Sequence, residues 1–199
     1  MLPSYFVIIG AVIGSIGALW YLVDTIRGTV KPNRVSFLLW SIAPLIAFTA
    51  EVQKGVGIQS LMTFSVGFLP LLIFLASFVN KKAEWKITRF DLTCGALSLL
   101  ALILWLITKE GNIAILLSIA ADGLAAVPTI VKAYHHPETE VGWIWLAAAI
   151  NGLLTLLTVT DWTLAHYGFP LYILLVDLTI YAPIQFELKK RIGRIRAIV

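Results

Sequence analysis

The stretch that decides the fold is ILLSIAADGLAAVPTIVKAYHHPETE, from Ile115 to Glu140, which places an aspartate inside an apolar run. Asp122 is surrounded by aliphatic residues, and Pro128 follows it six positions later. The apolar part is long enough for a bilayer helix, which needs about 20 apolar residues. A carboxylate inside such a helix is costly unless it faces a partner or a cavity. The stretch therefore predicts a membrane helix that carries a polar site.

The composition places the whole chain in the membrane class. Of its 199 residues, 59% are hydrophobic and 13% are charged, and the mean hydropathy is +0.91. Soluble domains carry about 25% charged residues, so this chain could not cover a water-facing surface. Its single cysteine, Cys94, cannot form an intrachain disulfide. Nucleophile, P-loop and zinc-protease motifs do not occur, so we expect no enzyme, no metal and no cofactor.

Seven apolar segments predict an all-α integral membrane protein with seven transmembrane helices. The first segment lacks a basic start and a cleavage site, so we interpret it as a retained helix and not as a signal peptide. The predicted spans are Tyr5–Val23, Val35–Val52, Ile58–Val79, Leu92–Thr108, Ile113–Tyr134, Val141–Thr160 and Tyr167–Phe186.

Basic residues predict the orientation, because positively charged loops stay in the cytoplasm. With alternate loops assigned to one side, that side collects thirteen of the fifteen basic residues, and only Lys54 and Lys109 lie on the other. We therefore expect a multi-pass protein of the plasma (inner) membrane with its N-terminus outside and its C-terminus in the cytoplasm. Attraction to anionic membrane lipid is enough to explain the net charge of +4, so no nucleic-acid partner is needed to account for it.

The order of the segments predicts an internal repeat. Residues 1–90 and 111–199 would each form a three-helix bundle, and residues 91–110 would form a linker helix between them. The third span of each bundle carries a proline, Pro70 or Pro183, and a basic run follows. Each bundle has three spans and one further span lies between them, so both bundles enter the membrane from the same side. They would therefore be parallel repeats related by an axis along the membrane normal.

This three-one-three plan resembles the SWEET and PQ-loop transporter superfamily, as a divergent prokaryotic-type member. The turn Val127-Pro128-Thr129 before a polar loop is similar to a PQ-loop motif in which threonine replaces glutamine. The resemblance implies alternating access, with Pro44 and Pro128 as the hinge prolines. Spans one and six carry no proline, unlike the SWEET pattern.

Polar residues near the helix midpoints are the candidate substrate-binding residues. They are Ser15, Ser41 and Ser65 in the first bundle, and Asp122, Asn151 and Asp177 in the second. Each aspartate costs about 2.5–3.5 kcal/mol at mid-bilayer on insertion scales. Two nearby carboxyl groups could share a proton, which would suit proton-coupled transport or a cationic substrate. A hydrogen-bond network that only holds the helices together is the structural alternative.

The tryptophans at positions 20, 40, 105, 143, 145 and 162 fall mostly near span ends, which predicts an interfacial aromatic belt. Taken together, these features predict a transporter of a small polar solute, sugar-like or amino-acid-like, that works by alternating access. A non-transporting receptor or scaffold of the same fold, as in the KDEL receptors, is one alternative. A vitamin carrier resembling the nicotinamide riboside transporters is another, and the sequence leaves homo-oligomer formation open.

Overall fold

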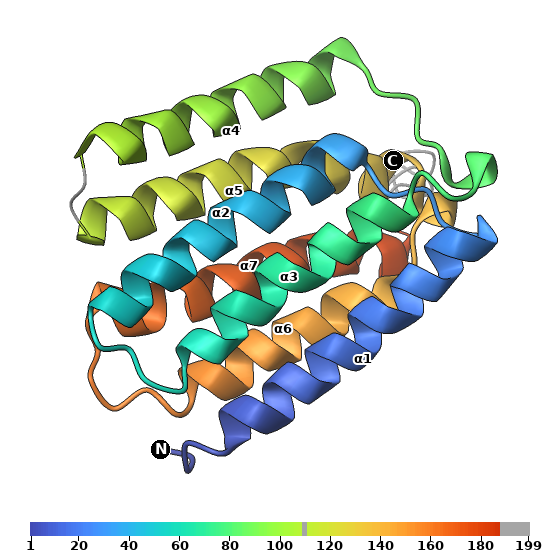
Figure 1. Ribbon diagram of the computed structural model, residues 1–199. Helices are drawn as coiled ribbons and strands as arrows, with labels where there is room; N and C mark the ends of the chain where they lie inside the picture. The colour runs from blue at the N-terminus through green and yellow to red at the C-terminus, as the bar shows by residue number, and fades with distance from the viewer. Residues whose placement is uncertain (109–110, 188–199) are drawn as a thin grey trace, which may run out of the picture.

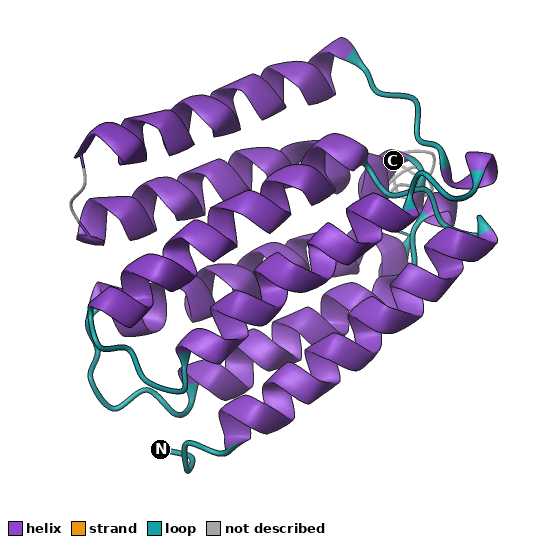
Figure 2. Cartoon of the chain, viewed as in Figure 1, coloured by secondary structure: helices purple, strands orange, loops and turns teal. Residues whose placement is uncertain are grey.

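The computed structural model describes residues 1–108 and 111–187, and this part of the chain contains helices and no strands (Figure 2). Two short 3-10 turns, η1 (Lys81–Ala83) and η2 (Pro137–Thr139), lie in loops. The seven α-helices are α1 (Phe6–Arg27), α2 (Arg34–Gln53), α3 (Ser60–Ala76), α4 (Arg89–Thr108), α5 (Gly111–His135), α6 (Gly142–Leu156) and α7 (Leu164–Phe186).

Each of the seven predicted spans corresponds to one helix, so the all-helical, membrane-type class is confirmed. Within the described residues, α1, α2, α5 from Asn112 onwards, and α7 are long and apolar enough to cross a membrane. The apolar helices α3 and α6 are shorter than predicted, at 17 and 15 residues. The difference at α6 arises because Leu157–Thr160, although apolar enough to extend the predicted span, adopts turn and loop structure.

Six of the helices form a closed ring, in the order α1, α3, α2, α5, α7, α6 and back to α1. The seventh, α4, lies outside this ring against α5 and α2, at the top of Figure 1. Among the first three helices α3 lies between α1 and α2, and among the last three α7 lies between α5 and α6. The ring closes through two contacts, α1 with α6 and α2 with α5.

The close approach of α1 to α6 depends on glycines along one face of α1. A Cβ added at Gly17 would lie 2.6 Å from the Ala147 Cβ, and one at Gly10 would lie 2.9 Å from the Asn151 Oδ1. Such separations are shorter than van der Waals contact, so the two backbones can pack this closely only because α1 lacks side chains there. The glycine face thus brings Asn151 into the ring's interior wall.

The loops gather at two ends of the molecule. The loops α1–α2, α3–α4 and α5–α6 lie together at the end that we call the basic end, and the N-terminus lies at the opposite end (Figure 1). At the basic end Asn33 caps α2 by accepting bonds from the N–H groups of Val35 and Ser36, and its Nδ2 donates to Asp91 Oδ1 at 3.0 Å. This bond ties the start of α4 to the α1–α2 loop and places α4 beside α2.

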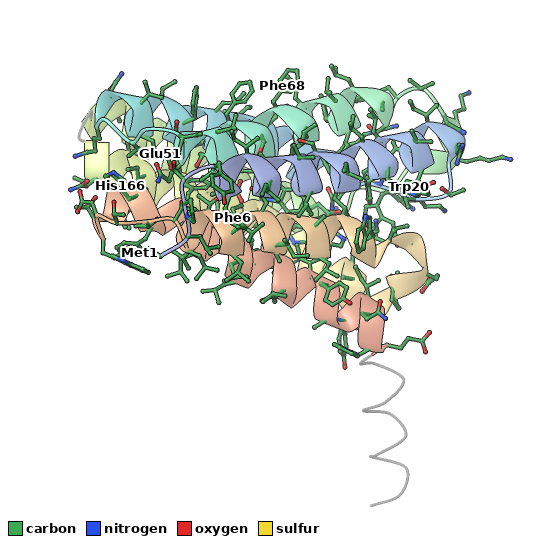
Figure 3. The ribbon with its side chains drawn as sticks, turned by 90° about the horizontal axis from the view of Figure 1, so that it is seen from below. Met1, Phe6, Trp20, Glu51, Phe68 and His166 are labelled. Carbon is green, nitrogen blue, oxygen red and sulfur yellow. The ribbon has the colours of Figure 1, made fainter. Side chains whose placement is uncertain are left out.

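The outer surface of the ring is apolar, as a lipid-facing surface must be. Ile8, Val12, Ile16 and Leu19 of α1 are all exposed and follow helical spacing along one face. Phe68 of α3 also points outward in Figure 3. An apolar surface of this extent is unusual for a soluble monomer and typical of contact with lipid.

Candidate functional site

A cavity lies in the interior of the six-helix ring. Its empty space is about 660 Å³ including its open mouth, of which the centres of water molecules can occupy about 70 Å³. This is room for a few waters, so a larger solute would require the helices to move apart. All six ring helices contribute to the wall, and the described residues of α4 do not. The polar and aromatic side chains of the wall are Phe37, Trp40, Ser65, Asp122, Trp145, Asn151 and Asp177.

Four of the six polar residues singled out by the sequence line this cavity. Asp122 comes from α5, Asn151 from α6 and Asp177 from α7, and Ser65 of α3 faces them from the first three helices. The Asn151 Nδ2 donates a long hydrogen bond of 3.4 Å to the Ser65 Oγ, which itself donates to the Met62 carbonyl at 2.7 Å. The cavity therefore collects polar groups from both halves of the chain.

The two carboxyl groups differ in their surroundings. Tyr172 of α7 donates a 2.6 Å hydrogen bond to Oδ2 of Asp122, while Oδ1 of Asp122 is buried without a partner among the described residues. No hydrogen bond to the Asp177 carboxyl occurs within the described chain, and this group lines the cavity. Asp122 is thus held by one donor, whereas Asp177 is left for water or a ligand to solvate.

Aromatic side chains line the cavity toward the basic end. The ring centroids of Trp40 and Trp145 lie 5.6 Å apart in an edge-to-face pair, and Phe37 packs 5.2 Å from Trp40. Tyr21 stacks on Phe37 at 5.5 Å. The Trp40 Nε1 donates to the backbone carbonyl of Asp122 at 3.2 Å, and the Trp145 Nε1 has no partner among the described residues.

The prediction of an interfacial belt is therefore wrong for Trp40 and Trp145, which are buried. It fits Trp20, Trp143 and Trp162, which are exposed; Trp20 lies toward the basic end in Figure 3. The side chain of Trp105 lies outside the described residues. Position near a span end could not separate these groups, because the angle around the helix decides whether a tryptophan faces lipid or the ring interior.

Ser15 and Ser41 are not part of the cavity wall. The wall uses Gly14 and Ala18 of α1, and a neighbouring residue such as Ser15 is turned by about 100° around the helix. Ser41 is buried but follows Trp40 directly, and its hydroxyl donates to the Leu38 carbonyl of its own helix at 2.6 Å. Both serines lie near the midpoints of their helices, but their side chains do not face the cavity.

The two predicted hinge prolines also differ in position. Pro44 lines the cavity from α2, and Pro128 does not. Both lie inside continuous helices, since α2 runs through Pro44 and α5 runs through Pro128. Their role as hinges stays a prediction.

Sequence reasoning missed a buried ion pair at the basic end. The Lys132 Nζ lies 2.5 Å from Glu140 Oε1, and both side chains are almost fully buried. Tyr21 of α1 donates a 2.9 Å hydrogen bond to Glu140 Oε2, and Lys132 also donates to the Lys31 carbonyl. The α5–α6 loop folds back against α1 and buries both side chains.

One further buried carboxyl lies away from the cavity. Glu51 of α2 accepts a 3.0 Å hydrogen bond from Thr63 of α3 through Oε1, and its Oε2 has no partner in the described part of the chain. Figure 3 places it, with His166, toward the end opposite Trp20. An acidic residue close to a span end gave no signal that it would be buried.

Charge in the cavity is one-sided. Among the residues that the structure describes, its wall contains two carboxyl groups and no lysine, arginine or histidine. The nearest buried cation of the basic end, Lys132, is paired with Glu140. Protons or a cationic ligand would therefore have to balance any negative charge that the two aspartates carry.

Comparison with protein-family models, with curated proteins and with solved structures finds no match for this chain. The argument for function consequently rests on the geometry of the cavity and the arrangement of the helices.

Proposed function

We propose that this protein is a membrane transporter of a small polar solute that works by alternating access between two three-helix bundles. The single observation that carries the proposal is a pair of carboxyl groups on the wall of a central cavity: Asp122 leaves its buried Oδ1 without a partner among the described residues, and Asp177 accepts no hydrogen bond there. Buried polar groups are normally hydrogen-bonded, and exceptions beside a central cavity are expected where a ligand supplies the missing partner.

The packing of the helices supports a three-one-three architecture. In this proposal α1–α3 and α5–α7 are equivalent bundles, and α4 is the linker outside both. A two-fold exchange of the bundles turns the α1–α6 contact into the α5–α2 contact, and both contacts close the observed ring. The same exchange turns α3 between α1 and α2 into α7 between α5 and α6. This is the contact pattern that parallel repeats around a central site would produce.

The orientation in the membrane is part of the same proposal. The basic end carries the loops with Arg27, Lys31, Lys81, Lys82 and Lys86, and by the positive-inside rule it faces the cytoplasm. Phe37, Trp40 and Trp145 then line the cytoplasmic part of the cavity, and the buried Lys132–Glu140 pair lies at the same end of the molecule. Opening toward the cytoplasm would separate α1 from the α5–α6 loop, which Tyr21 and Glu140 now join.

Flux into proteoliposomes tests the proposal. The purified chain is reconstituted, and uptake of a radiolabelled sugar, amino acid, organic amine and nicotinamide riboside is compared with uptake into protein-free vesicles. Saturable uptake of any of them supports a transporter, and uptake of nicotinamide riboside alone supports the vitamin carrier. Saturable binding without flux of any bound solute contradicts transport and supports a receptor of the same architecture.

A further inference from the structure

We propose that the ligand of the cavity is a small organic ammonium cation, with N–H donors on a compact apolar body. This inference rests on the proposed function for its meaning in the cell, but it concerns binding and is tested separately. The observation that supports it is that the cavity wall leaves more hydrogen-bond acceptors than donors without a partner.

The polar groups of the wall offer far more acceptors than donors. Oδ1 of Asp122 is buried without a partner, and the Asp177 carboxyl lines the cavity without a hydrogen bond, both among the described residues. Among the described residues of this wall, the Trp145 Nε1 is the one buried donor without a partner. A ligand that satisfies this wall must donate several hydrogen bonds, as a primary ammonium group does with three N–H bonds.

The charge of the wall favours the same chemistry. Asp122 and Asp177 line the cavity, and no basic side chain of the described part of the chain does so. An anionic ligand would meet carboxyl groups with no cation to offset them, and a neutral sugar would leave protons alone to balance their charge. A cation gains charge-assisted hydrogen bonds, which are roughly twice as strong as neutral ones.

The aromatic residues define the body of the ligand. Trp40 and Trp145 line the cavity with Phe37, in contact with one another at 5.2–6.4 Å between ring centroids. Aromatic faces attract cations and also bury apolar carbon. The small space in the cavity favours a ligand of few heavy atoms. A hydroxyl oxygen on the ligand, at the end away from its ammonium group, could accept a hydrogen bond from the free Trp145 N–H.

The test is ligand binding to the purified full-length chain in detergent, followed by thermal unfolding. The ligands are ethanolamine and butylamine at neutral pH, where both are cations. Each has a neutral partner of similar size, ethylene glycol for ethanolamine and 1-butanol for butylamine, and glucose serves as the sugar. A ligand that binds only the folded protein raises the unfolding temperature in a saturable way.

We expect both amines to stabilise the protein saturably, while their neutral partners and glucose do not. Asp177→Asn should weaken the apparent amine affinity at least tenfold. Glu51→Gln is the matched control, because it neutralises a buried carboxyl outside the cavity, and it should leave the affinity unchanged. Asp122→Asn should act like Asp177→Asn, which gives a second variant if one of them folds poorly.

Three outcomes would overturn the inference: no saturable effect of either amine, equal binding of the neutral partners, or amine binding that survives both aspartate substitutions. Failure here is distinguishable from failure of the transport proposal. Flux of a neutral solute without amine binding would contradict the proposal of a cationic ligand but not that of a transporter. Amine binding without flux would contradict the proposal of a transporter but not that of a cationic ligand.

Discussion

The Tyr172 hydroxyl of α7 donates a 2.6 Å hydrogen bond to Oδ2 of Asp122 on α5, and so joins these two neighbouring helices at the edge of the cavity. It is the only side-chain donor to the Asp122 carboxyl among the described residues. The bond therefore fixes the direction of one carboxyl group while the other, on Asp177, remains open to the cavity.

Tyr172→Phe should destabilise the protein by about 1–3 kcal/mol, because it leaves a second buried acceptor of Asp122 without a partner. Thermal unfolding in detergent measures this effect. Adding Asp122→Asn should cost less in the Tyr172→Phe background than in the wild type, since the two residues share one interaction. Additive losses would show that the bond contributes nothing to stability.

The two cavity aspartates should couple solute movement to protons. Asp122→Asn and Asp177→Asn should each keep the fold, since the amide matches the carboxylate in size, and should remove most of the stimulation of uptake by an imposed proton gradient. The losses should be non-additive if the two groups share a proton. Uptake into proteoliposomes with and without the gradient measures this, and Glu51→Gln is the control.

A double variant that keeps the full response to the proton gradient would end the coupling hypothesis. The aspartates would then belong to a structural network or to a site that binds solute without protons.

The buried ion pair at the basic end should be important for stability. Glu140→Gln leaves Lys132 buried without an anion, and breaking one partner of a buried pair costs about 3–5 kcal/mol. Glu138→Gln in the same loop is the control, because its side chain is largely exposed to solvent. We expect a change within about 0.5 kcal/mol there. Equal unfolding temperatures of the two variants would contradict the buried pair.

The contact between α1 and α6 should not tolerate a methyl group. Gly17→Ala places a Cβ 2.6 Å from the Ala147 Cβ, and overpacking of this kind costs about 1–3 kcal/mol. Gly123→Ala on α5 is the matched control, since its Cβ would meet Tyr172 only at an ordinary 3.7 Å. A loss of stability in Gly123→Ala as large as in Gly17→Ala would argue against close packing at the glycine face.

The sequence allowed the position of each helix to be predicted, because a long apolar run determines where a membrane helix must form. Depth within a helix could be predicted in the same way, so Ser65, Asp122, Asn151 and Asp177 were selected together. The direction of a side chain could not be predicted for Ser15 and Ser41. These helices carry apolar side chains on every face, so hydropathy does not show which face turns toward the interior of the ring.

The partners of the polar groups depend on tertiary contacts that no local pattern reveals. Tyr172 reaches Asp122 across fifty positions, and Tyr21 reaches Glu140 across 119. The burial of Lys132 follows from the fold of the α5–α6 loop over α1, and a charged residue near a span end otherwise predicts only a solvated loop. The aromatic wall of Trp40 and Trp145 escaped prediction for the same reason.

Access to the cavity from both sides of the membrane tests the central claim most directly, and it needs no known substrate. Cys94 is the only cysteine, so Cys94→Ala gives a background without thiols, into which Ser65→Cys places one thiol on the cavity wall. A membrane-impermeant methanethiosulfonate is then applied to right-side-out or to inside-out vesicles. Gly57→Cys and Lys86→Cys, in loops at opposite ends, report the outside and the cytoplasm.

Alternating access predicts that Ser65→Cys reacts from both sides, while Gly57→Cys reacts only from outside and Lys86→Cys only from the cytoplasm. Reaction of Ser65→Cys from one side alone, or from neither, would contradict a transporter and leave a binding protein or a closed scaffold.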